Sequence, residues 1–290
     1  MFDGFRLDRI DAGGVPLRVR HGGHGPPVLL LHGHPRTHAT WHRVAPELAR
    51  DHTVVCPDLR GYGQSGKPAD GQDHVNYSKR AMAADCLALM RSLGHDQFAV
   101  VGHDRGSYVA LRLALDHPEA VTRLAFLGLV PIGEALARVN ARFAANWWHW
   151  FFYAQPDQPE RLINADPGGH YRLGEAVAEA MGQENYQDMY SAVHDPATVH
   201  AMMEDYRAGL GIDRAHDDAD KAAGRTVACP TLVLWPANDE EDRDLYPDIL
   251  AIWKTWAPDL RGGPFDSGHH MAEENPGELV RALRPFLAGS

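Results

Sequence analysis

The sequence has few cysteines, no long apolar run and a shortage of positive charge. Its only three cysteines are Cys56, Cys86 and Cys229, and their scattered positions lack the spacing of a metal site or a disulfide framework. We therefore expect free thiols in a reducing compartment. No apolar run is long enough to span a membrane, and residues 1–6 lack the pattern of a signal peptide, so a cytoplasmic location is expected.

Acidic residues outnumber basic ones. Lysine and arginine total 28 against 39 aspartates and glutamates, which gives a net charge of −11. This excess disfavours nucleic acid and anionic membranes as partners. It also repels anionic substrates, so a local cationic site would be needed to bind one. A small-molecule substrate is the expected partner, and a homodimer is left open.

Histidine is abundant, with 18 residues, which raises the question of a metal. His34, His38 and His42 recur at intervals of four, as they would on one face of a helix. However, Pro35 follows His34, so the segment begins as a loop, and no acidic residue lies among the three as a zinc protease would need. We expect no metal and no other cofactor.

Short apolar segments alternate with helical patterns along most of the chain. Five of these segments are typical of buried strands: 28–31, 54–56, 98–101, 124–127 and 231–235. Helical patterns cover 78–93 and 107–116, and the second ends at His117-Pro118 because the residue before a proline avoids the helix. Strands alternating with helices predict an α/β fold with a doubly wound, mostly parallel sheet.

The alternation stops at about residue 133 and resumes at Val227. The segment between is helical in pattern and rich in tryptophan, tyrosine and methionine. We predict a core domain formed by 1–132 and 223–290, with an inserted helical lid at 133–222 that supplies the aromatic wall of a pocket. With 290 residues and 44% apolar content, the chain is long enough for such a core.

Residues 102–106, Gly-His-Asp-Arg-Gly, follow the predicted strand 98–101 and precede a helical pattern. This arrangement is typical of a nucleophile elbow, whose sharp turn requires small residues on both sides. The central residue is Asp104 where most elbows have serine. A carboxylate needs no base to attack carbon, and the attack yields an alkyl ester. The elbow therefore favours a dehalogenase or an epoxide hydrolase over an esterase, lipase or peptidase. The structural alternative is that Asp104 is only a helix N-cap.

The chain resembles the α/β-hydrolase superfamily over nearly its whole length, and within it the fluoroacetate (haloacetate) dehalogenases. Generic superfamily motifs are Leu31-His32-Gly33-His34-Pro35 and the run from Pro57-Asp58 to Gln64-Ser65. Further matching pieces are the elbow with Arg105, Asp116-His117-Pro118, Ala165-Asp166-Pro167 and Gly268-His269. Much more specific are two elements of the predicted lid, Trp148-His149-Trp150 and Asp205-Tyr206-Arg207-Ala208-Gly209. The resemblance implies the α/β-hydrolase fold, and epoxide hydrolases are near relatives.

An ester intermediate needs a general base to activate water, and histidine has a suitable pKa. His269 follows Gly268 after the predicted last strand, 261–265. We predict that His269 is this base. The neighbouring His270 is the alternative.

The chain differs from the dehalogenases it resembles in the position of the acid that orients this histidine. In fluoroacetate dehalogenases it follows the strand that matches 124–127, but here that position is Gly128. Asp239, after the strand at 231–235, is predicted to replace it. The alternatives are Glu240, Glu241, Asp242 and the more remote Glu134.

The backbone N–H groups of His34 and Arg105 are predicted to form the oxyanion hole. The resemblance implies that His149, Trp150 and Tyr206 donate to the departing fluoride, because an imidazole, an indole and a phenol can converge on a small anion. An aromatic lid core is the structural alternative. His149 and Tyr206 could equally protonate an opening epoxide.

The resemblance also implies two arginines that clamp a substrate carboxylate. Arg105 matches the first, but Tyr108 occupies the second position. Arg36, on the predicted oxyanion loop, is a candidate replacement, and Tyr108 could pack on a bulkier substrate. Either another cation compensates or the substrate is not a small carboxylate.

Together these features predict a hydrolase that forms an ester on Asp104 and cleaves it with water activated by His269. The main hypothesis is a haloacetate-type dehalogenase, and the alternative is an epoxide hydrolase. A non-catalytic binding protein is disfavoured, since a receptor has no need of a nucleophile and a base.

Overall fold

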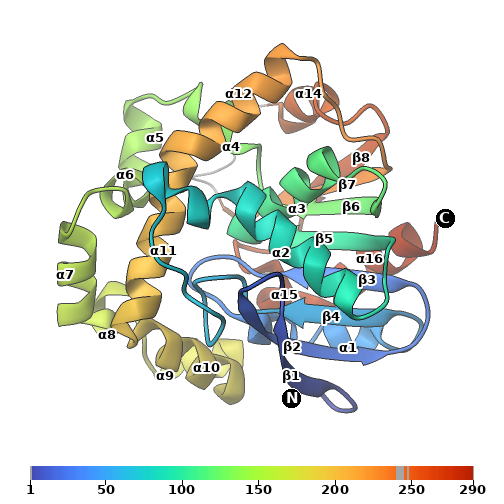
Figure 1. Ribbon diagram of the computed structural model, residues 1–290, viewed down its shortest axis with the longest axis horizontal. Coiled ribbons are helices and arrows are strands. Elements are labelled where there is room, and N and C mark those ends of the chain that lie inside the picture. Colours follow the sequence, from blue (N-terminus) through green and yellow to red (C-terminus); the bar gives the residue numbers. More distant parts are fainter. Residues whose placement is uncertain (1, 240–244, 247, 290) are drawn as a thin grey trace.

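In the computed structural model, which describes residues 2–239, 245–246 and 248–289, an eight-stranded sheet forms the centre of the molecule (Figure 1). The strands are β1 (Arg6–Asp11), β2 (Pro16–Gly23), β3 (Pro27–Leu31), β4 (Thr53–Pro57), β5 (Phe98–His103), β6 (Val121–Leu127), β7 (Thr231–Pro236) and β8 (Leu260–Phe265). Their order is β1-β2-β4-β3-β5-β6-β7-β8. The six strands from β4 to β8 are parallel, and β1 and β2 are antiparallel at one edge. The predicted mostly parallel sheet is therefore present.

Helices of the core cover both faces of this sheet. They are η1 (His38–Trp41), α1 (Ala45–Leu48), η2 (Gln72–Tyr77), α2 (Lys79–Ser92), α3 (Arg105–Asp116), α14 (Ile249–Lys254), α15 (Met271–Glu274) and α16 (Pro276–Ala288). Alternate residues of the central strands face opposite layers. Leu29 and Val100 pack in the cluster that contains α2 and α3, whereas Leu30 and Val101 pack in the cluster with α1 and α16. The sheet is thus buried on both faces, as doubly wound sheets are.

Every element between β6 and β7 is a helix. These are α4 (Ile132–Leu136), α5 (Ala141–Asn146), α6 (Trp148–Tyr153), α7 (Gln158–Ala165), α8 (Pro167–His170), α9 (Glu175–Met181), α10 (Gln183–Val193), α11 (Pro196–Ala208), η3 (Gly209–Asp213) and α12 (Arg214–Ala222). Figure 1 shows α5 to α11 gathered to one side of the sheet, at the left of the view. The inserted helical segment is present, while its treatment as a separate cap with limits 133 and 222 stays a prediction.

A buried ionic cluster ties this inserted segment to the core. Asp205 on α11 contacts Arg105 at the start of α3 and Lys79 at the start of α2. All three side chains are at most 3% exposed. The cluster fixes α11 above the carboxyl ends of the parallel strands, where α/β sheets place their ligands.

None of the helices in the described part of the chain is long and apolar enough to cross a membrane.

Candidate active site

Asp104 lies in the sharp turn between β5 and α3. Its backbone has φ 50° and ψ −123°, a left-handed conformation that L-residues rarely adopt. The turn leaves no room for side chains at the neighbouring glycines. A Cβ at Gly102 would lie 2.4 Å from a backbone carbonyl oxygen, and a Cβ at Gly106 would lie 2.3 Å from another. The glycines on either side therefore permit the strained turn that the sequence pattern predicts.

The two oxygens of the Asp104 carboxylate have different surroundings. Oδ1 accepts a hydrogen bond from the backbone N–H of His34 at 2.8 Å, and the backbone N–H of Arg105 also donates to the carboxylate. Oδ2 lies 3.8 Å from Nε2 of His269. Burial opposes ionisation of Asp104, but the two neighbouring histidines, His269 and His103, and the backbone donors together lower its pKa below the usual value. The carboxylate is therefore ionised at neutral pH.

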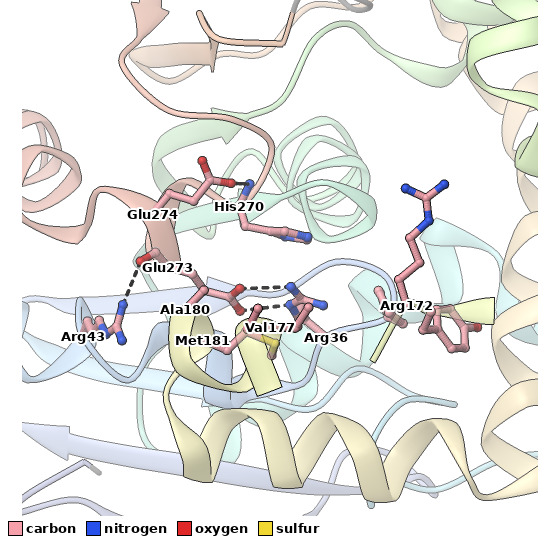
Figure 2. A pocket seen from close by; sticks show the side chains of 12 residues that line it. Arg36, Arg43, Arg172, Val177, Ala180, Met181, His270, Glu273 and Glu274 are labelled. Carbon is pink, nitrogen blue, oxygen red and sulfur yellow. Dashed lines mark hydrogen bonds and ion pairs between the residues drawn. The ribbon is translucent and has the colours of Figure 1, made fainter. Parts of the chain in front are cut away.

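His269 is the histidine beside Asp104. Its side chain, which is 42% exposed, follows β8. The backbone oxygen of His269 accepts a hydrogen bond from Nε2 of His103, at 2.7 Å. His270 instead lines a second cavity (Figure 2). The geometry favours the predicted choice of His269 over His270.

Asp239 lines the same cavity as Asp104 and His269. Gly128 borders the adjoining small space and has no side chain to offer. Glu134 accepts hydrogen bonds from Lys221 and Trp256, so a structural role accounts for it. The acidic residues that follow Asp239 in the sequence, Glu240, Glu241 and Asp242, lie outside the described residues. That Asp239 orients His269 stays a prediction.

The cavity at Asp104 has a volume of about 230 Å³. The structure brings the three predicted lid donors to it, and residues near them complete its wall. The lining residues are His34, Asp104, Asn146, Trp147, His149, Trp150, Tyr206, Asp239 and His269. Burial lowers the pKa of His149 to about 4, so its imidazole is neutral at neutral pH and has one N–H to donate. Sequence reasoning misses Asn146, because an asparagine at a helix end carries no motif of its own.

The side chain of His34 also belongs to this wall. Its ring packs among tyrosines, 5.2 Å from the ring of Tyr206 and 5.3 Å from that of Tyr153. Both ring nitrogens are buried without a hydrogen-bond partner. Burial lowers the pKa of His34 to about 3, so the ring is neutral. An unsatisfied buried donor costs about 1–3 kcal/mol.

Arg105 forms an ion pair with Asp205. Its Nη2 and Nε donate to the two carboxylate oxygens at 2.7 and 3.1 Å, and Nη2 also donates to the backbone oxygen of Asp205. The guanidinium lies 4.2 Å from the ring centre of Tyr206. Its buried charge is compensated by Asp205, so Arg105 positions Tyr206 and the lid helix α11. Asp205 belongs to a motif that the chain shares with the dehalogenases it resembles, but the sequence alone assigns this residue no role.

Arg36 does not line the cavity of Asp104. It borders the second cavity, of about 760 Å³, where both Nε and Nη2 donate to Glu273 at 3.0 Å (Figure 2). Tyr108 packs against Trp150 and Phe126 and borders the small space beside Asp104. Among the residues that the structure describes, no lysine or arginine lines the cavity of Asp104.

Two of the histidines at intervals of four have partners within the protein. His38 begins the short helix η1 and its Nδ1 lies 2.7 Å from Asp58, while Nδ1 of His42 contacts the backbone oxygen of Ala39. Within the described chain, three other groups have the donor spacing of a metal site: His103-His269-His270, His38-Asp58-Asp188 and Asp70-His200-Glu204.

Comparison with known proteins places this arrangement in a family. The model of the α/β hydrolase fold family matches residues 26–276. The chain therefore belongs to the α/β hydrolase family, and it is a hydrolase.

Individual relatives narrow the class further. The chain is 41% identical to a fluoroacetate dehalogenase from Burkholderia sp., over 99% of this chain and 95% of that protein. It is 29% identical to a soluble epoxide hydrolase from Corynebacterium sp. (strain C12), over 99% and 96%. Among solved structures, a putative α/β hydrolase from Nostoc sp. PCC 7120 has a TM-score of 0.93 with 41% identity, and the match covers 100% of both chains. A putative epoxide hydrolase from Pseudomonas aeruginosa has a TM-score of 0.89 with 44% identity over 99% and 96%. The predicted resemblance to dehalogenases, with epoxide hydrolases as near relatives, is confirmed.

Proposed function

We propose that this enzyme is a haloacetate-type dehalogenase that works through an ester on Asp104. The observation that supports this function best is that the two oxygens of the Asp104 carboxylate have different surroundings. Oδ1 accepts from the backbone N–H of His34, and the backbone N–H of Arg105 also donates to the carboxylate. Oδ2 lies on the side of His269, in a cavity walled by His149, Trp150 and Tyr206.

In the first step, Oδ2 attacks the carbon that carries the halogen. The carbon–halogen bond breaks with its electron pair on the halogen, and the halide leaves toward the N–H and O–H donors of the lid. Fixed donors stabilise this developing charge without reorganisation of solvent. The step leaves an alkyl ester on Asp104.

In the second step, His269 takes a proton from water, and the water oxygen attacks the ester carbonyl carbon of Asp104. The negative charge then develops on Oδ1, between the N–H groups of His34 and Arg105. Collapse of the intermediate releases the alcohol and restores the carboxylate. Overall, the halide, a proton and a 2-hydroxy acid are formed from the halo acid and one water.

Asp239 is proposed to accept a hydrogen bond from the second ring nitrogen of His269 and so to stabilise the imidazolium formed in the second step. We expect Asp239→Asn to lower kcat by a factor of about 10² or more through this step, with Glu134→Gln as the matched acid-to-amide control. An undiminished kcat in Asp239→Asn would assign the orienting role elsewhere.

One observation favours the epoxide-hydrolase alternative. The described wall of the cavity contains no lysine or arginine to hold a carboxylate, and Asp239 adds negative charge. A neutral epoxide would avoid this repulsion, and His149 and Tyr206 would then donate to the ring oxygen.

A parallel assay separates the two reactions. Purified enzyme is incubated with fluoroacetate, chloroacetate and styrene oxide, and halide and diol are measured in each case. Halide release from the haloacetates is expected, and it should be lost in Asp104→Ala. Diol formation without halide release would establish the epoxide-hydrolase function instead.

We further propose that residues 133–222 act as a cap domain and that the enzyme works in the cytoplasm on small molecules. The three free cysteines fit a reducing compartment. A measurement of the molecular mass in solution would show whether the protein is a homodimer.

A further inference from the structure

Three histidines meet at the carboxyl ends of β5 and β8. His103 is the last residue of β5, and His269 and His270 precede α15. The ring centre of His269 lies 5.0 Å from that of His103 and 4.9 Å from that of His270. One ring nitrogen of each lies within 4.8 Å of the others. Zinc–nitrogen bonds of about 2.0–2.1 Å require ligand nitrogens roughly 3.4 Å apart, so small side-chain rotations would complete such a set.

The hydrogen bonds of the cluster match those of metal ligands. Nε2 of His103 donates to the backbone oxygen of His269, because a carbonyl oxygen can only accept. This bond leaves a lone pair on the other nitrogen of His103, and metal-binding histidines commonly hold their second N–H in this way. Nδ1 of His270 is buried and has no hydrogen-bond partner. Nδ1 is thus a nitrogen of His270 that no protein group occupies and that could serve as a metal ligand.

The cluster is open to an incoming ion. The side chain of His269 is 42% exposed, and Figure 2 shows His270 at the edge of the large cavity. The Asp104 carboxylate, 3.8 Å from His269, adds a nearby negative charge that attracts a cation. Three imidazoles with an open fourth position suit zinc, copper or nickel, whereas calcium and magnesium prefer oxygen ligands.

The other two groups with metal-like spacing are already satisfied. In the first, Asp58 accepts hydrogen bonds from both the backbone and the ring of His38. In the second, His200 lies between Asp70 and Glu160 and contacts both carboxylates. Their hydrogen bonds explain these clusters without a metal.

We infer that His103, His269 and His270 form an inhibitory binding site for zinc-class divalent ions. An ion held there takes the lone pair of His269, so water is no longer activated and the ester on Asp104 is not hydrolysed. Inhibition, but not binding, rests on the proposed role of His269. A chelator should restore activity, because the ion is not part of the mechanism.

The test uses metal-free wild-type enzyme and the variant His270→Gln, which removes one ligand outside the proposed machinery. The exposed His24 provides the matched control, His24→Gln. Zinc binding is measured by titration calorimetry, and cobalt binding by the visible spectrum of the wild type. Inhibition is measured on whichever substrate the wild type converts.

We expect one zinc per chain, strong cobalt bands typical of low coordination number, and inhibition reversed by a chelator. His270→Gln should bind zinc at least tenfold more weakly, while His24→Gln behaves like the wild type. Equal affinity in both variants, or absence of binding to the wild type, would overturn the site. If His270→Gln does not fold, the cobalt spectrum of the wild type still tests the proposal, because its absence, or weak bands typical of six-coordinate cobalt, would contradict a site of three imidazoles. Zinc binding without inhibition would leave the site standing and refute the role of His269.

Discussion

At the scale of single residues, the proposed roles of Asp104 and His269 belong to two steps of the reaction that can be separated. Without its base, His269→Ala should still form the ester on Asp104 but should not hydrolyse it. We expect the intact mass of this variant to increase by the mass of one alkyl group after incubation with substrate. Asp104→Asn provides the control and should stay unmodified. An unchanged mass of His269→Ala, with a substrate that the wild type converts, would refute the assignment of His269 to the second step.

Tyr108 stands at the position that the resemblance to haloacetate dehalogenases assigns to a second carboxylate-binding arginine. The structure pairs the candidate substitute, Arg36, with Glu273. A charge-assisted hydrogen bond contributes about 1.5–3 kcal/mol, so Tyr108→Arg should lower the KM for fluoroacetate by about ten- to a hundredfold. The kcat should change little, because the contact exists in both the ground state and the transition state. Tyr108→Met is the neutral control. A rise in KM in Arg36→Ala would show instead that Arg36 holds the carboxylate.

The buried ring nitrogens of His34, which have no hydrogen-bond partner, are expected to reduce the free energy of unfolding. Replacement by the similarly shaped phenylalanine, His34→Phe, removes the unsatisfied nitrogens and should raise the free energy of unfolding by about 1–3 kcal/mol. His34→Gln keeps a polar group at the same place and should give no such gain. Urea unfolding of the three proteins checks this. A loss of stability in His34→Phe would mean that the ring is satisfied in solution, for example by water.

At the scale of elements, the stability of α11 on the core depends on Asp205. Asp205→Asn removes the carboxylate that pairs with both Arg105 and Lys79 and leaves only Asp213 nearby, which should cost about 3–5 kcal/mol. Asp218→Asn, which loses an ion pair with the exposed Arg214, is the matched control and should cost less than about 0.5 kcal/mol.

The pH dependence of this cluster follows from the pKa of Asp205. Burial opposes ionisation, but Arg105 and Lys79 hold the pKa well below its usual value. The pKa in the folded state is thus lower than in the unfolded state, about 3.9. The stabilisation is therefore complete above that pH and falls as pH falls toward the folded-state value. In unfolding measured from pH 7 to 2.5, the difference between wild type and Asp205→Asn should shrink below about pH 4. A constant difference would contradict the ionic origin.

At the scale of the whole molecule, the net charge of −11 and the acidic cavity both repel a haloacetate. Salt screens this repulsion, since the Debye length falls to about 10 Å at 0.1 M. We expect kcat/KM for chloroacetate to rise with ionic strength, while kcat/KM for a neutral epoxide such as styrene oxide, if it is converted, stays unchanged. A decrease for chloroacetate would reveal an attractive cationic path to the site.

The parallel strands, the helical insertion and the elbow could be predicted because each leaves a local pattern. The strands β1 and β2 were not predicted from the sequence. Most residues of β1, from Arg6 to Asp11, are exposed, so this edge strand lacks the apolar run of a buried strand. The structure was needed to choose between His269 and His270, because the two histidines are adjacent in the sequence. In the fold they border different cavities.

The sequence by itself determined the class of protein, because an aspartate between glycines in a strand–turn–helix segment is a local feature that fixes the turn and predicts the nucleophile. It also determined the family, through motifs such as Asp205-Tyr206 and Gly268-His269. Only the tertiary structure decided which charges pair. Arg105 pairs with Asp205, 100 positions away, and Arg36 pairs with Glu273, 237 positions away. Such pairings depend on which side chains the packed layers bring together, and no local pattern encodes them.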